Sequence, residues 1–223
     1  MTQEHSGGAA TAGEREPGLF EVMYSTRAMR RLKPDPLSQE TLLRLIEAAI
    51  QAPTPSNTQL WRWIIVLDAE QKQKLGALNR TAVLAYMQRG SALITPETPA
   101  EAARAARSRA ALEWQAEHFH EAPAIIVACA DADPAMTPAG RRAAGAITIW
   151  PAVQNLLLAA RALGLGATPT TLGLSDRDAS RAVLNLPDEI EAHALIPVGY
   201  PLGRFGPVSR PPVTRVIRFD RWS

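Results

Sequence analysis

Short strand-like runs alternate with longer helical stretches along most of this chain of 223 residues. The strand-like runs are apolar and rich in β-branched or aromatic side chains, and they cover residues 61–67, 123–130, 166–172, 192–199 and 213–219. The helical stretches cover residues 42–50, 70–79, 81–91, 99–119, 139–164 and 176–184. No internal repeat and no linker interrupts residues 18–223, so the alternation predicts one α+β domain with a small sheet flanked by helices, and with 213–219 as an edge strand.

Individual side chains indicate where one of these helices begins and whether another is continuous. Ser38 is expected to cap the helix that follows it, with Leu37 and Leu42 packing together as a hydrophobic staple. Pro151 lies inside the stretch 139–164, where it either opens a second helix at its first turn or kinks a continuous one.

The single cysteine and the N-terminus indicate the compartment. Cys129 lies in an apolar run, which favours a buried structural thiol, and one cysteine excludes an intrachain disulfide. Residues 1–17 are polar and rich in Gly and Ala, unlike a secretory signal, and are expected to form a disordered tail. No apolar run approaches the roughly 18 residues of a membrane span. We therefore expect a cytoplasmic protein that does not associate with membranes.

The basic residues are almost all arginine, at 21 of the 24 cations. Guanidinium groups suit bidentate contacts with anions, which would fit a phosphate or a nucleic acid, although compositional bias accounts for most of them. A nucleic-acid partner is disfavoured because the arginines are scattered along the chain and 22 acidic residues leave a net charge of only +2.

Standard catalytic and nucleotide motifs are missing from the sequence. It contains no G-x-G-x-x-G after a strand, no phosphate-binding P-loop and no G-x-S-x-G nucleophile elbow. His118 and His120 could approach a common metal ion, but a third ligand at suitable spacing is lacking, so exposed histidines are the better interpretation. We expect neither a metal site nor a catalytic nucleophile from the protein.

Three segments carry candidate binding residues. Arg27 and Arg30 are three residues apart in a basic turn and could converge on one anion, although a solvated basic patch is the alternative. Two prolines stiffen the polar loop 52–61 before a strand, where a simple turn is also possible. Prolines also flank Arg210 within 203–212 and would hold it in an extended direction, ready to bind phosphate with little loss of entropy.

Read together, these segments resemble the FMN-dependent nitroreductase family. The motifs occur in the order T-R-x-x-R-R, A-P-x-x-S-N-x-Q-x-W, V-Q-N-L-L-L-A-A, R-A-L-G-L-G-A and I-P-V-G-Y-P, with a later S-R-P-P. The resemblance runs from about Tyr24 to Trp222 and is weakest over 80–118, where the family varies a helical excursion. It implies an intertwined α+β homodimer with a small, mostly antiparallel sheet and FMN bound at the subunit interface.

The resemblance also assigns the cofactor-binding residues. Arg27, Ala28 and Arg30 would line the phosphate and ribityl side, and Arg210 would close on the phosphate. The other subunit would bring Pro53, Thr54 and Pro55, with Ser56 and Asn57 behind them, to the flavin ring. Backbone N–H groups along Pro169, Thr170, Thr171 and Leu172 would contact the ring edge. Family members often have Ser in place of Ala28, and some have an acidic residue followed by Gly in place of Thr171 and Leu172.

The implied chemistry belongs to the cofactor. NAD(P)H would reduce FMN, and a small oxidant such as a nitroaromatic or a quinone would then take its place in a ping-pong cycle. Two alternatives stay open: a flavin-binding or sequestering protein with little turnover, and a flavoenzyme of the same fold with different chemistry, such as dehalogenation, enoyl or azo reduction, or flavin destruction.

Overall fold

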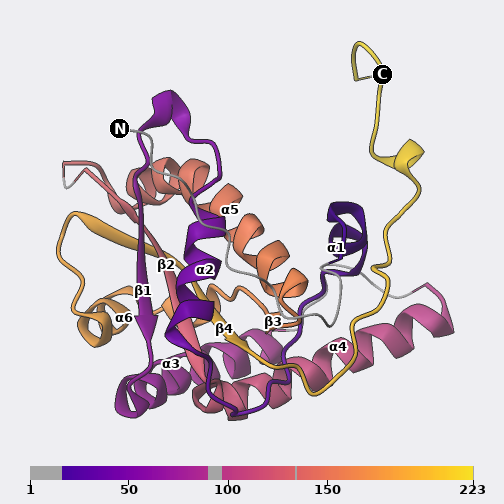
Figure 1. The fold of residues 1–223 in the computed structure, drawn as a ribbon, viewed down its shortest axis with the longest axis horizontal. Helices are drawn as coiled ribbons and strands as arrows, with labels where there is room; N and C mark the ends of the chain where they lie inside the picture. The colour runs from indigo at the N-terminus through magenta and orange to yellow at the C-terminus, as the bar shows by residue number, and fades with distance from the viewer. Residues whose placement is uncertain (1–16, 90–96, 134, 223) are drawn as a thin grey trace, which may run out of the picture.

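The computed structural model describes residues 17–89, 97–133 and 135–222, and these form a four-stranded antiparallel sheet with helices on both faces (Figure 1). The strand order is β1-β2-β4-β3. The strands are β1 (Trp61–Val66), β2 (Ala124–Asp131), β3 (Gly166–Ala167) and β4 (Ile190–Gly199). All three pairings are antiparallel, which confirms the expected α+β fold with a small antiparallel sheet.

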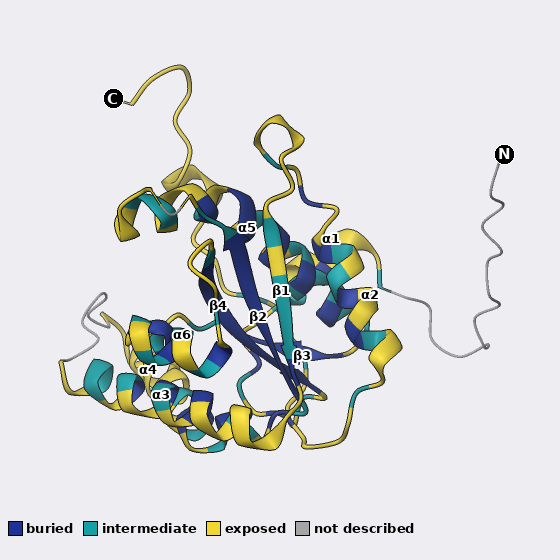
Figure 2. Ribbon diagram, turned by 90° about the vertical axis from the view of Figure 1, so that its left-hand side faces the viewer, coloured by how far each residue is buried: buried dark blue, intermediate teal, exposed yellow. Residues whose placement is uncertain are grey.

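The two middle strands are buried on both faces, as the dark colour of β2 and β4 in Figure 2 shows. Alternate residues of β2 belong to two apolar clusters: Ile126 and Ala128 to one, Ile125 and Val127 to the other. A strand covered on both faces needs apolar side chains at every position. This explains why the run at 123–130 is continuously apolar in sequence.

Six α-helices surround the sheet in the described residues. They are α1 (Leu19–Ser25), α2 (Gln39–Ala49), α3 (Ala69–Gln88), α4 (Pro99–His118), α5 (Pro138–Ala162) and α6 (Arg177–Leu184). Apolar residues of α2 and α5 pack on one face of the sheet, and residues of α3 and α6 contribute to the cluster on the other face. Short 3-10 turns lie at Pro55–Asn57, Phe119–Glu121, Leu172–Leu174 and Val213–Arg215.

The structure confirms the predicted Ser38 cap and decides between the two alternatives for Pro151. The Ser38 hydroxyl accepts the Thr41 backbone N–H at 3.1 Å, and Leu37 and Leu42 join the same apolar cluster. Pro151 lies inside the single helix α5, so it does not open a second helix.

Within the described residues α5 is the one helix long and apolar enough to span a membrane, but Ile149, Ala152, Val153 and Leu156 bury its inner face in the core.

Several predicted boundaries differ from the structure. The stretches 70–79 and 81–91 form one continuous helix, α3, and the expected end at Ser91 lies outside the described residues. The predicted strand 166–172 pairs with β4 only at Gly166–Ala167 and again at the isolated bridge of Thr170. Pro169 has no backbone N–H to continue the ladder, which accounts for the interruption. The short helix α1 was not expected, and apart from Pro17 the predicted tail 1–17 lies outside the described residues.

The prediction of an edge strand at 213–219 is wrong. Val213–Arg215 forms a 3-10 turn, and no residue of 213–219 pairs with a described strand. In Figures 1 and 2 this C-terminal segment projects away from the sheet. Alternating side chains make a strand only where a sheet edge lies alongside to accept the backbone hydrogen bonds.

Candidate functional site

The basic segment near the N-terminus lies extended between the edge of the sheet and the chain that leaves β4. Ala28 bridges Ala167 in parallel, and Leu32 bridges Pro201 in antiparallel orientation. The Leu202 N–H donates to the Arg31 carbonyl at 3.0 Å. These pairings place the arginines after α1 beside the C-terminal segment, although the two are far apart in sequence.

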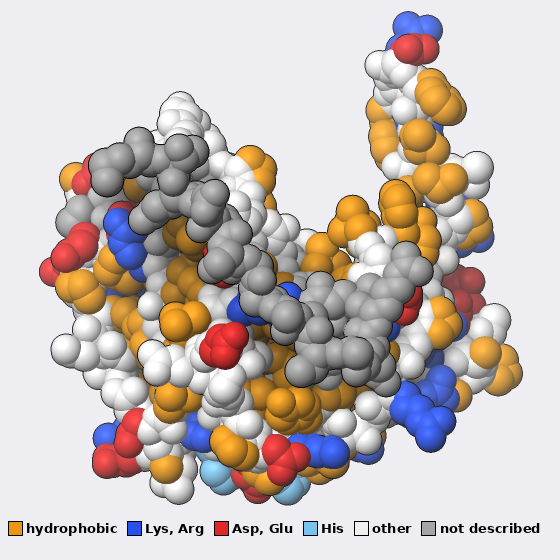
Figure 3. Space-filling model, in the orientation of Figure 1, with side chains coloured by type: hydrophobic (Ala, Val, Ile, Leu, Met, Phe, Trp, Pro, Cys, Tyr) orange, Lys and Arg blue, Asp and Glu red, His pale blue; other side chains and the backbone are white. Residues whose placement is uncertain are grey.

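A hollow of about 570 Å³, called here the first hollow, lies between this basic segment, helix α4 and the residues around Arg210. It brings together the predicted residues Arg27, Ala28, Arg30 and Arg210. The remaining lining residues are Thr26, Arg104, Arg107, Ser108, Ala111, Pro207, Val208 and Ser209. Figure 3 shows Lys and Arg side chains gathered over the right-hand end of α4, below the projecting C-terminal segment.

The sequence interpretation missed Arg104 and Arg107. They lie in the region 80–118, where the family motifs match least, yet they are three residues apart on a predicted helix and therefore share one face. Arg104 Nη1 donates to Ser209 Oγ at 2.9 Å, which joins α4 to the segment carrying Arg210. Helical spacing of the two arginines was the signal that could have found them.

Among the described residues, arginines line the first hollow and no carboxylate does. None of its five arginines forms an ion pair with a carboxylate of the described residues. Arg30 Nε is buried without a hydrogen-bond partner in this part of the chain, and burial lowers the pKa of its guanidinium. A buried cation without a partner is unfavourable, so the hollow is suited to an anion that accepts from Arg30 and its neighbours.

A second hollow of about 300 Å³ adjoins the first and shares Arg27, Ala28, Arg30, Arg107 and Ala111 with it. Its own lining adds Met29, Arg31, Ala110, Gly203 and Arg204. In the part of the chain that the structure describes, no carboxylate lines either hollow.

The predicted loop 53–57 lies elsewhere in the subunit. It follows α2 at the end of the molecule opposite α4, as both ribbon views show (Figures 1 and 2). Its residues are exposed, apart from the half-buried Thr54, whose hydroxyl accepts the Gln59 N–H at 3.1 Å. Ser56 and Asn57 hold φ values of 49° and 54°, which are unfavourable for residues other than glycine. Within one subunit, the structure does not bring this loop to the arginines.

The segment 169–172 continues from the β3 edge that pairs with Ala28. Thr170 is already occupied: its N–H donates to the Leu195 carbonyl at 2.9 Å, and its hydroxyl donates to Asn79 Oδ1 at 3.3 Å. The Leu172 N–H donates to the Thr170 hydroxyl, and Pro169 has no N–H. The exposed Thr171 therefore carries the N–H of this segment that is without a partner among the described residues. Asn79, buried on α3, was missed by the sequence interpretation.

In the described part of the chain, His118 and Cys129 lie in structural contacts and not in a reactive centre. His118 stacks on Trp114 with ring centroids 4.2 Å apart, and its Nδ1 lies 3.0 Å from Glu121 Oε1. Among the described residues, no three His, Cys, Asp or Glu side chains form a metal-binding group. Cys129 is fully buried, and burial, followed by the charge of Glu191, raises the pKa of its thiol to about 12.

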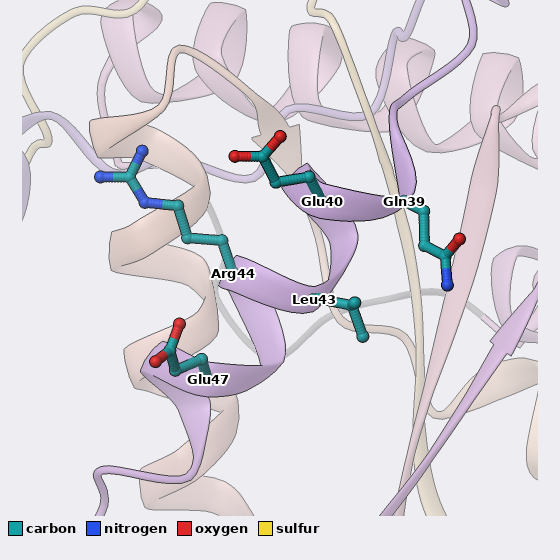
Figure 4. A pocket seen from close by; sticks show the side chains of 5 residues that line it. All are labelled: Gln39, Glu40, Leu43, Arg44 and Glu47. Carbon is teal, nitrogen blue, oxygen red and sulfur yellow. The ribbon is translucent and has the colours of Figure 1, made fainter. Parts of the chain in front are cut away.

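A separate hollow of about 410 Å³ lies on the outer face of α2 (Figure 4). Gln39, Glu40, Leu43, Arg44 and Glu47 line it, all on one helix. It contains none of the predicted site residues, and two carboxylates make it poorly suited to an anion. The two arginine-lined hollows are therefore the candidate site.

Comparisons with known proteins agree with the fold and the motifs. Residues 23–200 match the sequence model of the Nitroreductase family. The chain is 31% identical to a NADH dehydrogenase of Thermus thermophilus over 86% of this chain and 90% of that protein. It is 24% identical to an iodotyrosine deiodinase of Thermotoga neapolitana over 82% of this chain and 88% of that protein.

Solved structures share the fold. An oxidised iodotyrosine deiodinase bound to FMN and 3-iodo-L-tyrosine superposes with a TM-score of 0.70 at 22% identity, covering 92% of this chain and all of that one. The NADPH:FMN oxidoreductase of Vibrio harveyi, complexed with NAD+, superposes with a TM-score of 0.67 at 19% identity, covering 92% of this chain and 78% of that one.

Proposed function

Because the chain belongs to the nitroreductase family, we propose that it is an FMN-dependent oxidoreductase that uses NAD(P)H to reduce nitroaromatics, quinones or related small oxidants. The observation that carries this proposal is the first hollow. Guanidinium groups from both ends of the chain and from α4 surround it, and no carboxylate of the described residues lines it.

The residues of the first hollow fit the phosphate of FMN. A phosphate monoester carries nearly two negative charges and accepts bidentate hydrogen bonds, which planar guanidinium groups donate well. Arg27, Arg30 and Arg210 would hold this phosphate, with Arg107 facing it from α4. The Arg30 guanidinium group, whose Nε has no partner among the described residues, lines this hollow and would gain an acceptor on binding. Ala28 would contribute its backbone and leave space beside the ribityl chain.

For the flavin ring, the fitting donor is the Thr171 N–H, because the neighbouring N–H groups of Thr170 and Leu172 are used within the chain. The loop 53–57 lies away from the arginines of its own subunit, so it would act as the family resemblance implies and cover the ring of the partner subunit's cofactor. A shared site of this kind requires a homodimer.

Exposed apolar side chains support a dimer. Phe20 on α1 is 68% exposed, Ile147 on α5 is 64% exposed, and Phe219 and Trp222 in the projecting C-terminal segment are 80% and 81% exposed. Apolar groups of this size are unfavourable in water, and contact with a second copy would bury them.

Bound FMN would supply the hydride-transfer chemistry between a reduced nicotinamide nucleotide and the oxidant. The protein's own residues bind and orient: the arginines neutralise the phosphate, and Thr171 donates a hydrogen bond to the ring edge. No protein nucleophile is needed, in keeping with the inert Cys129 thiol.

A second candidate is a flavoenzyme of the same fold with different chemistry, such as reductive dehalogenation. The similarity to iodotyrosine deiodinases favours it. It shares the FMN site and differs in the oxidant.

The test is anaerobic reduction of the purified protein. We expect bound FMN at one per chain, bleaching of its visible bands by NADH or NADPH, and recovery of the colour with a quinone or a nitroaromatic. Bleaching that is reversed by a halotyrosine and not by quinones would favour the second candidate. A colourless protein that fails to bind added FMN would contradict both.

A further inference from the structure

The two arginine-lined hollows hold more positive charge than one FMN phosphate can neutralise. Arg27, Arg30 and Arg107 line both hollows, Arg104 and Arg210 line only the first, and Arg31 and Arg204 line only the second. A bound phosphate monoester offsets about two of these seven charges. The remaining positive charges lie close together, and no carboxylate of the described residues lines the hollows that they share.

Arg104 has an acidic neighbour outside the hollows, Glu101. Hydrogen bonds from the Glu97 and Thr98 backbone N–H groups lower the pKa of Glu101, and the charge of Arg104 lowers it further. Arg104 also donates to Ser209. Arg31 and Arg204, in contrast, form no ion pair with any carboxylate of the described residues.

Arg31 and Arg204 both line the second hollow, and backbone hydrogen bonds hold the two segments that carry them side by side. The segment 31–33 pairs with 200–202 through the Leu202 N–H on the Arg31 carbonyl and the Lys33 N–H on the Tyr200 carbonyl. Arg107 faces them from α4, with Ala110 and Ala111 forming an apolar wall beside it. This arrangement offers guanidinium donors for a second phosphate and a small apolar surface next to it.

We propose that the second hollow binds the 2′-phosphate of NADPH and so makes NADPH the preferred reductant; this inference rests on the proposed function. A 2′-phosphate is a monoester with nearly two negative charges, whereas each phosphate of the pyrophosphate bridge in both nucleotides carries one. Several guanidinium groups around a small hollow favour the denser charge. Adenine can stack on a guanidinium plane or lie against the alanines of α4.

The test measures binding to the FMN-loaded protein by titration calorimetry, with adenosine 2′,5′-bisphosphate and adenosine 5′-diphosphate as probes. The variant is the double substitution Arg31→Gln and Arg204→Gln, which leaves the first hollow's own residues intact. Arg109→Gln is the matched control, because Arg109 lies on α4 outside both hollows and pairs with Glu113.

We expect the wild type and the control to bind the 2′,5′-bisphosphate more tightly than the diphosphate. The double variant should lose about tenfold or more in affinity for the bisphosphate, with little change for the diphosphate. In steady-state assays its KM for NADPH should rise by a similar factor while kcat and the KM for NADH change little. Equal losses for both probes would assign the hollow to the pyrophosphate and overturn the preference for NADPH.

Unchanged affinity of the double variant for both probes would overturn the second phosphate site altogether. FMN content, measured on the same samples, separates this inference from the proposed function. A wild-type protein that binds no FMN contradicts the proposed function, whereas a fully loaded protein with unaltered probe binding contradicts only the second site.

Discussion

Arg104 Nη1 on α4 donates a hydrogen bond to Ser209 Oγ at 2.9 Å, next to Arg210. This contact ties the region least similar to the family motifs to the segment proposed to close on the FMN phosphate. It makes α4 part of the site, because Arg104 and Arg107 line the same hollow as Arg27, Arg30 and Arg210.

Removing the acceptor of this bond should loosen the C-terminal segment. For Ser209→Ala we expect an FMN dissociation constant about two- to tenfold higher, since one hydrogen bond to a charged donor on an exposed surface contributes about 0.5–1.5 kcal/mol. Fluorescence titration of apoprotein with FMN measures the change. Thr214→Ala, a hydroxyl deletion farther along the same segment, is the control. Equal FMN affinity in both variants would show that the Arg104–Ser209 bond does not support the site.

The projecting C-terminal segment should bind a second copy of the chain. Phe219→Ser with Trp222→Ser removes its two most exposed aromatic side chains. We expect the wild type to be a dimer. The dimer dissociation constant of the double variant should be about tenfold or more higher, because truncating a buried interfacial Trp costs about 2 kcal/mol or more. Light scattering over a dilution series measures this. A wild-type monomer that retains FMN would refute the shared-site arrangement.

Gly166 allows the basic segment to approach the edge of the sheet. A Cβ at this position would lie 2.8 Å from Met29 Cβ and 2.9 Å from Leu32 Cδ2. Gly166→Ala should therefore lower the free energy of unfolding by about 1–3 kcal/mol through overpacking. Gly203→Ala is the control, since its Cβ would meet only Met29 Cε at an ordinary 3.7 Å. Chemical denaturation of both variants measures the difference, and equal stabilities would contradict the close approach.

His193 on β4 should make stability depend on pH. Burial lowers the pKa of its imidazole, with Glu191 raising it and Arg142 lowering it to smaller extents, and its Nε2 is buried without a partner in the described residues. Because the unfolded state binds the proton more readily, the free energy of unfolding is highest above the ordinary histidine pKa of about 6.5 and falls as the pH drops below it.

Urea denaturation between pH 5 and pH 7.5 measures this dependence. His193→Gln should flatten the slope, whereas His120→Gln, outside the buried strand, serves as the matched control. A wild-type slope that persists in His193→Gln would assign the dependence to other groups.

Much of the fold could be predicted because it depends on local pattern. The Ser38 cap marks where α2 begins. The apolar periodicity of α2 and the continuous apolar run of β2 report which of their faces are buried. The alternation of 213–219 predicts a strand wrongly, because alternation does not show whether a sheet edge lies alongside.

Of the site, the convergence of Arg27, Arg30 and Arg210 was anticipated from spacing and family motifs. Helical spacing shows that Arg104 and Arg107 share one face of α4. Only the packing of α4 across two distant segments brings that face to the hollow. The hydrogen bond from the Thr170 hydroxyl to Asn79 Oδ1 likewise depends on a tertiary contact.

The central claim is that the first hollow binds the phosphate of FMN, and Arg210→Ala tests it most directly. Arg210 is exposed and lines only this hollow, and Arg109→Ala on α4 removes an equal charge outside it. Fluorescence titration of the apoproteins should give an FMN dissociation constant about ten- to a hundredfold higher for Arg210→Ala, since a charge-assisted contact of about 1.5–3 kcal/mol is lost, and near the wild-type value for Arg109→Ala. Full FMN affinity in Arg210→Ala would contradict the assignment.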